Sequence, residues 1–342
     1  MQLTYRLNLA AIILAAAVVI LGAYTRLTDA GLGCPDWPGC YGFLTVPVKA
    51  DDVIQAQQAF PERPVETHKA WNEMVHRYFA GSLGLLIAVI WAFCLKQRQQ
   101  VVLSSALLIT VCFQAILGMW TVTMNLMPLV VMGHLLGGFT TFCLLVLLAL
   151  NLRRSIHASS ISWSPSAHCH KFYSYSKWVL LVLVLQIALG GWTASNYAAV
   201  VCTELPICEG DWQSKFDFAR AFSVPTGYST YEYGVFPYEA RMTIHIMHRL
   251  GAVITILTVL AFAWVLTRSK STRLRGYSIA LSTIVAIQFA LGISNVVLQL
   301  PLMIAVAHNF VALCLLACLI TLMFKLREQG IQQHGFNTWV KE

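Results

Sequence analysis

The uncharged run LLGGFTTFCLLVLLALNL at residues 135–152 indicates the environment in which this chain folds. A helix needs about 20 apolar residues to cross the hydrocarbon core of a bilayer, and this run is long enough once its apolar neighbours are included. The whole chain has the same character: 58% of its 342 residues are hydrophobic, 11% are charged, and the mean hydropathy is +0.66. A soluble domain carries about 25% charged residues, so this composition predicts a membrane protein.

The apolar stretches are numerous enough for a polytopic protein. Backbone groups in hydrocarbon must be satisfied within the segment, which favours helices, and the runs lack the alternation of a membrane β-barrel. We therefore predict an all-α polytopic membrane protein with eight transmembrane helices. They are expected near residues 5–25, 70–95, 101–123, 128–150, 176–195, 241–267, 275–298 and 301–325.

Lysine and arginine residues predict the orientation, because they collect on the cytoplasmic side. With the N-terminus in the cytoplasm, the inner segments hold 14 of the 23 Lys and Arg residues and only two of the 15 acids. Both termini are then cytoplasmic, and two long loops, 26–69 and 196–240, face outward. No mitochondrial transit signal is visible, which favours a bacterial inner membrane. The net charge of +8 reflects this topology, so it does not indicate a nucleic-acid partner.

An internal repeat divides the chain into two halves. The segment LGAYTRLTDAGLGCPDWPGC (21–40) aligns without a gap with LGGWTASNYAAVVCTELPIC (189–208). In the same way, QAILGMWTVTMNLMPLVVMGH (114–134) aligns with QFALGISNVVLQLPLMIAVAH (288–308). The repeat predicts two pseudo-symmetric four-helix bundles, 1–154 and 176–330, with a cytoplasmic linker at 155–175 and a cytoplasmic tail at 331–342. Because the first helix has a counterpart, we expect it to be retained and not cleaved as a signal peptide.

Four histidines fall inside predicted helices at equivalent positions and similar depth, roughly 10 Å from the outer surface at 1.5 Å per residue. They are His76, His134, His248 and His308. A single membrane histidine is usually a packing residue, but four at matched positions indicate function, since polar groups at this depth are costly. Two imidazoles without a thiolate or carboxylate cluster are an incomplete zinc site, whereas haem needs two axial nitrogens on opposite sides. The pattern predicts two bis-histidine haems, one in each half.

Arginines and glycines near these histidines admit two interpretations each. Arg77 and Arg249 directly follow His76 and His248, and either bind haem propionates or extend to the membrane interface. A Leu-Gly pair recurs near the outer ends of four predicted helices, in VVILG, QAILG, QIALG and QFALG. Such pairs allow either close helix packing or close approach of a flat ligand.

The outward loops carry two equally spaced cysteine pairs, Cys34/Cys40 and Cys202/Cys208. An exported face is oxidising, which predicts two short-range disulfides that close the loops as lids. The alternative is a redox-active pair that passes electrons.

The repeat is broken at one charged position. WNEMVHRYFAG (71–81) places Glu73 three residues before His76, so the two side chains project from one helix face, whereas TIHIMHRLGAV (243–253) has His245 at the equivalent position. Only the first half therefore has a candidate general base beside its haem. The alternative is that Glu73 is an interfacial acid near a helix N-terminus.

These motifs together resemble the haem A synthase family over nearly all eight helices. The resemblance implies a membrane oxidoreductase that converts a ring methyl of haem O to the formyl of haem A for cytochrome oxidase assembly. It implies that His76 and His134 hold the substrate haem O, that Glu73 is the catalytic acid, and that a resident haem b is bound by two further histidines. Those are His248 and His308. The resemblance also matches Cys34/Cys40 to a loop pair with a functional role, and Cys202/Cys208 to its second-half counterpart.

Two other functions compete with this one. A di-haem b cytochrome for quinol-linked electron transfer would explain the histidines but not Glu73, and a haem transporter or chaperone would use the loops as gates. Partners expected besides lipid and haem O are a haem O synthase, an unidentified electron acceptor and a second copy of the chain. The sequence predicts neither the oxygen source nor the route of haem entry, and it assigns no role to residues 226–240.

Overall fold

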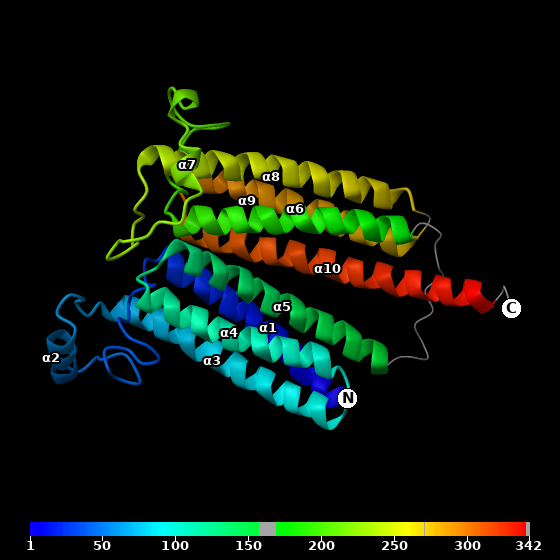
Figure 1. Ribbon diagram of the computed structural model, residues 1–342, viewed down its shortest axis with the longest axis horizontal. Coiled ribbons are helices and arrows are strands. Elements are labelled where there is room, and N and C mark those ends of the chain that lie inside the picture. Colours follow the sequence, from blue (N-terminus) through cyan, green and yellow to red (C-terminus); the bar gives the residue numbers. More distant parts are fainter. Residues whose placement is uncertain (157–168, 270, 340–342) are drawn as a thin grey trace.

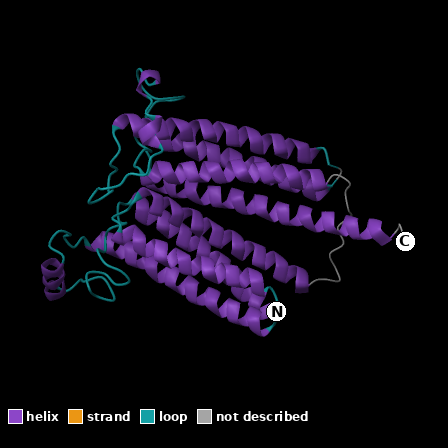
Figure 2. Cartoon of the chain, in the orientation of Figure 1, coloured by secondary structure: helices purple, strands orange, loops and turns teal. Residues whose placement is uncertain are grey.

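The computed structural model describes residues 1–156, 169–269 and 271–339. Within these residues the chain is helical and contains no β-strand (Figure 2). Eight helices are long and apolar enough to cross a membrane, which confirms the predicted class. They are α1 (Gln2–Leu27), α3 (Thr67–Lys96), α4 (Val101–Thr123), α5 (Pro128–Ile156), α6 (Cys169–Ser195), α8 (Tyr238–Thr267), α9 (Thr272–Val297) and α10 (Leu302–Trp339).

Helix boundaries and the loop helices differ from the expectation. Helix α10 continues to Trp339, beyond the predicted end at 325, although its apolar span ends at Glu328. The two long loops contain three short helices that the hydropathy pattern does not predict, because they are too short and too polar to resemble spans. These are α2 (Ala50–Ala59), η1 (Gln213–Lys215) and α7 (Phe218–Ala221).

The long helices form two groups of four. Helices α1, α3, α4 and α5 pack against one another, as do α6, α8, α9 and α10, and the groups meet where α1 and α5 contact α6 and α10 (Figure 1). Each helix of the first half has the same neighbours as its counterpart in the second half. A rotation axis relating the halves and the proposed domain boundaries stay predictions, and parts of the linker 155–175 and of the tail 331–342 lie outside the described residues.

The internal repeat extends to backbone conformation. The turn between α4 and α5 has left-handed residues at Asn125 and Leu126, with φ of 49° and 64°. The turn between α9 and α10 has them at the equivalent Gln299 and Leu300, with φ of 56° and 61°. Pro128 then opens α5 and Pro301 directly precedes α10, which suits a residue without an N–H donor. The two turns therefore start α5 and α10, which carry His134 and His308, in the same way.

The apolar core lies between the two halves and toward the end of the bundle opposite the long loops. Leu145, Leu148 and Leu152 of α5 are fully buried there, together with Leu319 and Leu322 of α10. On the outer surfaces of the helices, large apolar side chains are exposed, as expected for residues that contact lipid. Examples are Ile13, Leu85, Ile109, Leu257 and Met303, each more than half exposed.

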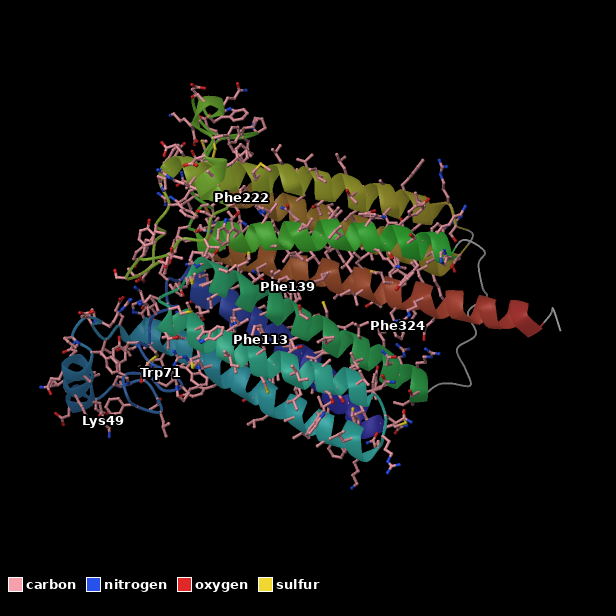
Figure 3. The ribbon with its side chains drawn as sticks, in the orientation of Figure 1. Lys49, Trp71, Phe113, Phe139, Phe222 and Phe324 are labelled. Atoms are coloured by element: carbon pink, nitrogen blue, oxygen red, sulfur yellow. A yellow bond between two sulfur atoms is a disulfide. The ribbon has the colours of Figure 1, made fainter. Side chains whose placement is uncertain are left out.

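The two long loops, between α1 and α3 and between α6 and α8, gather at one end of the bundle, and the N-terminus lies at the other (Figure 1). In Figure 3, Lys49 and Trp71 lie at the loop end, and Phe324 of α10 lies far from it. The four helix histidines occupy the loop-side parts of α3, α5, α8 and α10.

Candidate functional site

The four predicted histidines form two pairs, one in each half. His76 on α3 faces His134 on α5, with ring centroids 6.4 Å apart and ring planes at 83°. In the second half, His248 on α8 and His308 on α10 are electrostatic neighbours. All four histidine residues are partly exposed. The prediction that each half presents two imidazoles to one site is consistent with this geometry.

The recurring Leu-Gly glycines explain how the rings fit between helices. A Cβ atom built on each of these glycines would lie 3.0–3.3 Å from the Cε1 atom of one histidine. Each ring therefore lies against a neighbouring helix at the one position where no side chain is present. The pairs are Gly22 with His76, Gly118 with His134, Gly190 with His248 and Gly292 with His308.

The imidazole nitrogens are suited to metal binding. Metal-binding histidines hold one ring nitrogen with a hydrogen-bond partner and offer the other to the metal. Three of the rings follow this arrangement. Each ring forms a hydrogen bond with a backbone group of a neighbouring helix, and its Nδ1 atom is buried without a hydrogen-bond partner. The residues are His76 with Val18, His134 with Gln114, and His308 with Gln288.

These residues fit an iron porphyrin better than a zinc ion. A metal–imidazole bond is roughly 2 Å long and a ring nitrogen lies about 1 Å from the ring centre, so two imidazoles on opposite sides of one metal have centres about 6 Å apart. The 6.4 Å between His76 and His134 matches that spacing. Among the described residues, the one converging group of three His, Cys, Asp or Glu is Cys202, Cys208 and Glu209, which includes neither histidine pair.

Glu73 is buried one turn from His76, with 5% of its surface exposed. One carboxylate oxygen, Oε2, accepts a hydrogen bond of 2.8 Å from the backbone N–H of Cys34, and the other, Oε1, is ion-paired with Arg77. The carboxylate therefore joins helix α3 to the first disulfide loop. A buried charge with a cationic partner and a hydrogen-bond donor is what a positioned proton acceptor requires.

His245 occupies the equivalent place in the second half. It is also buried, with 4% of its surface exposed, and its Nδ1 atom has no hydrogen-bond partner. Without an acid at this position, Arg249 directs Nη2 to the carbonyl of Cys202 at 2.8 Å. The predicted difference between the halves is thus a difference in the charged groups beside the histidines.

The two disulfides are present, Cys34–Cys40 and Cys202–Cys208, which confirms the predicted pairing. Each closes a loop above its half, and an arginine binds the loop carbonyls. Nη1 of Arg249 donates to the carbonyls of Glu204 at 2.7 Å and Ile207 at 2.6 Å.

Arg77 binds the first loop in the same manner. Its Nη1 donates to the carbonyls of Asp36 at 2.9 Å, Pro38 at 3.3 Å and Gly39. Both guanidinium groups thus have loop partners, and their predicted contact with propionates stays a prediction. Sequence spacing could not show this role, since the acceptors are backbone atoms with no residue signature.

Residues 226–240, which had no assigned role, cross to the first half. Glu232 forms a 3.3 Å ion pair with Arg63, and the backbone N–H of Tyr231 donates to the carbonyl of Asn125 at 3.0 Å. A polar cavity of about 140 Å³ lies beneath this crossing, lined by Arg63, Glu66, Lys69 and Glu232 among others. Burial, with help from the nearby Glu66 carboxylate, raises the pKa of Tyr41 in its wall. This segment connects the loop ends of the two halves.

Two glutamines complete the histidine surroundings in the second half. Gln186 contacts His248 and Gln288 contacts His308 through their side-chain amides. The QIALG and QFALG repeats in the sequence draw attention first to their glycines. The glutamine that recurs four residues before each of those glycines was the available signal.

The fold and site define an eight-helix membrane protein whose halves each carry a facing histidine pair beneath a disulfide-closed loop. The chain belongs to the COX15-CtaA family of cytochrome oxidase assembly proteins, which residues 5–320 match.

Related proteins match almost the whole chain. The heme A synthase of Shewanella oneidensis is 50% identical over 329 residues, which is 95% of this chain and 97% of that protein. The heme A synthase of Allorhizobium ampelinum is 29% identical over 333 residues, covering 91% of this chain and 87% of the relative. That of Brucella anthropi is 25% identical over 324 residues, covering 88% and 85%.

Proposed function

We propose that this protein is a haem A synthase, a membrane oxidoreductase that converts haem O to haem A for the assembly of cytochrome oxidase. The family and the near full-length relatives support this activity. The observation that carries the proposal is the difference between two otherwise matched halves. Both have a histidine pair, but only the first has a buried carboxylate one turn from it.

We assign the substrate to the first half and a resident haem b to the second. His76 and His134 would hold the iron of haem O, and His248 and His308 that of haem b. The partnerless ring nitrogens and the 6.4 Å ring spacing support the first assignment. When bound, haem b would supply a one-electron redox centre in the second half.

The reaction converts a ring methyl and one water to a formyl group, with the release of four protons and four electrons. Glu73 is the acceptor for protons that leave the methyl or the water. Arg77 keeps the carboxylate in place, and the Cys34 N–H fixes its second oxygen. The four electrons require an acceptor whose chemical class is a membrane quinone or a redox protein.

The surroundings of the site suit this chemistry. The disulfide loop lies directly over Glu73, because the backbone N–H of Cys34 donates a hydrogen bond to the Glu73 carboxylate. The loop therefore excludes bulk water from this carboxylate. We propose that this loop and its second-half counterpart face the periplasm of a bacterial inner membrane, with both termini in the cytoplasm. A haem O synthase is a fitting neighbour, because its product is the substrate here.

The variant Glu73→Gln tests the role of the carboxylate. The amide still accepts the bond from Cys34 N–H but is a far weaker base, so we expect haem to remain bound while haem A formation falls at least about 100-fold. The measurement is chromatography of extracted haems, together with the absorption spectrum of the purified protein. Glu239→Gln, which changes an exposed acid in the first turn of α8, is the matched control. Normal haem A content in Glu73→Gln would exclude this role.

A further inference from the structure

The two halves hold their histidines in different ways. Nε2 of Gln186 on α6 lies 3.0 Å from Nδ1 of His248 and 3.0 Å from the His248 carbonyl. Nε2 of Gln288 on α9 lies 3.2 Å from Nε2 of His308. In the second half, therefore, each histidine has a side-chain amide on its ring.

The first half lacks these amide contacts. Val18 occupies the position equivalent to Gln186. Among the described residues, His76 and His134 have backbone partners but no side-chain hydrogen bond. Gln114, the equivalent of Gln288, does carry an amide, but its Nε2 is buried without a partner.

Neighbouring residues explain why the amides take different positions. A Cβ on Gly251 would lie 2.2 Å from Oε1 of Gln186, so only glycine leaves room for this amide, and the equivalent residue in the first half is Phe79. Conversely, a Cβ on Gly137 would lie 1.7 Å from Nε2 of Gln114, so Gln114 uses the space above that glycine. The equivalent of Gly137 is Val311, so the second half has a side chain where the first half has none.

The side-chain amide oxygens of the two glutamines can accept a hydrogen bond from a histidine that binds a metal. An imidazole that binds a metal through one nitrogen carries a proton on the other, which needs an acceptor. The Oε1 atoms of Gln186 and Gln288 are both buried without a partner. A half-turn of either amide exchanges its oxygen and nitrogen and places an acceptor on the ring. At Gln186 this acceptor replaces the bond that Nε2 donates to the His248 carbonyl.

We propose that Gln186, given space by Gly251, is a positioning residue that orients His248 to bind the iron of a permanently bound haem, with Gln288 acting likewise on His308. The first half, with Val18 and a displaced Gln114, holds its histidines by backbone contacts alone and releases its haem after each turnover. This inference rests on the proposed function. It adds the reason why one haem stays and the other leaves.

The test uses the full-length protein from a host that does not make haem O, so that haem b accounts for the spectrum. Loss of a partner beside a metal ligand typically weakens the site 10- to 100-fold. We expect Gln186→Leu to release haem b to excess apomyoglobin about 10-fold faster or more. Gly251→Ala should act in the same direction, because its Cβ displaces the amide. Gln114→Leu makes the same change at a side-chain amide that does not contact a histidine. It should leave the rate of haem b release unchanged.

The reduction potential separates positioning from packing. A stronger acceptor on the ring makes the imidazole a stronger donor to iron and favours the ferric state. The potential of haem b should therefore rise in Gln186→Leu and fall in Gln186→Glu, relative to the parent. Equal potentials in the parent and both variants would overturn the inference. Faster haem loss without the rise in Gln186→Leu and the fall in Gln186→Glu would overturn it as well. Persistence of the haem b band in His248→Ala would instead refute the placement of haem b, and with it the proposed function of the second half.

Discussion

At the scale of single residues, the four glycines beside the histidines determine where the rings can lie. Gly22 is the tightest, since a Cβ there would approach Cε1 of His76 to 3.0 Å. The ring would have to move by a few tenths of an ångström, and overpacking of this kind costs about 1–3 kcal/mol. The glycine is thus part of the site even though it has no chemistry of its own.

Gly22→Ala should weaken the binding of haem O by about 5- to 150-fold, because the displaced His76 ring no longer faces His134 correctly. The measurement is a spectral titration of haem O into purified protein. Gly81→Ala on α3 is the control, since a Cβ there meets no heavy atom within 4 Å. Equal affinities for the parent and Gly22→Ala would contradict the proposed ring placement.

At the scale of elements, the two disulfide loops are held by arginines of helices α3 and α8. Arg249 binds the carbonyls of Cys202, Glu204 and Ile207, and hydrogen bonds to a charged group contribute about 1.5–3 kcal/mol each. A single guanidinium fork therefore accounts for much of the order of the Cys202–Cys208 loop.

Arg249→Lys should loosen that loop, because one ammonium group cannot reach all three carbonyls in the geometry of the planar fork. We expect amide hydrogen exchange in residues 202–208 to accelerate at least about 10-fold, the loss of roughly one such bond. Arg220→Lys, at an exposed position in α7, should leave this segment unchanged. Unaltered exchange in Arg249→Lys would mean that the disulfide alone orders the loop.

The elements also show what the sequence could predict. The eight spans follow from apolar length, and the histidine pairs and disulfides follow from the gap-free repeat, because each signal is carried by residue type and spacing. The loop helices α2 and α7 and the arginine–carbonyl contacts were not predictable in this way, since backbone acceptors leave no pattern. The crossing of 226–240 to Arg63 depends on a pairing between distant segments that no local periodicity indicates. Glu73 was found because it breaks the repeat.

At the scale of the whole molecule, the loop between α1 and α3 and the loop between α6 and α8 lie at one end of the bundle, and the N-terminus lies at the other (Figure 1). The site lies at the loop end, where Glu73 meets the first disulfide loop. Its sidedness decides which compartment receives the protons released by the reaction, so it belongs to the mechanism.

A cysteine at Val48 should react with a membrane-impermeant maleimide in intact spheroplasts, because this exposed loop residue is expected to face the periplasm. A cysteine at Arg98, in the turn between α3 and α4 at the opposite end, should react only after permeabilisation. The parent protein provides the background from its own cysteines. The reverse pattern would invert the orientation and place the site on the cytoplasmic side.

The central claim is that one haem is the substrate and the other stays bound. Chromatography of the haems extracted from purified wild-type protein tests it most directly, in a host whose membranes contain haem O. The account predicts haem b together with haem A or a hydroxylated intermediate between haem O and haem A. Haem b alone would contradict it, and would instead favour a di-haem cytochrome or a haem carrier.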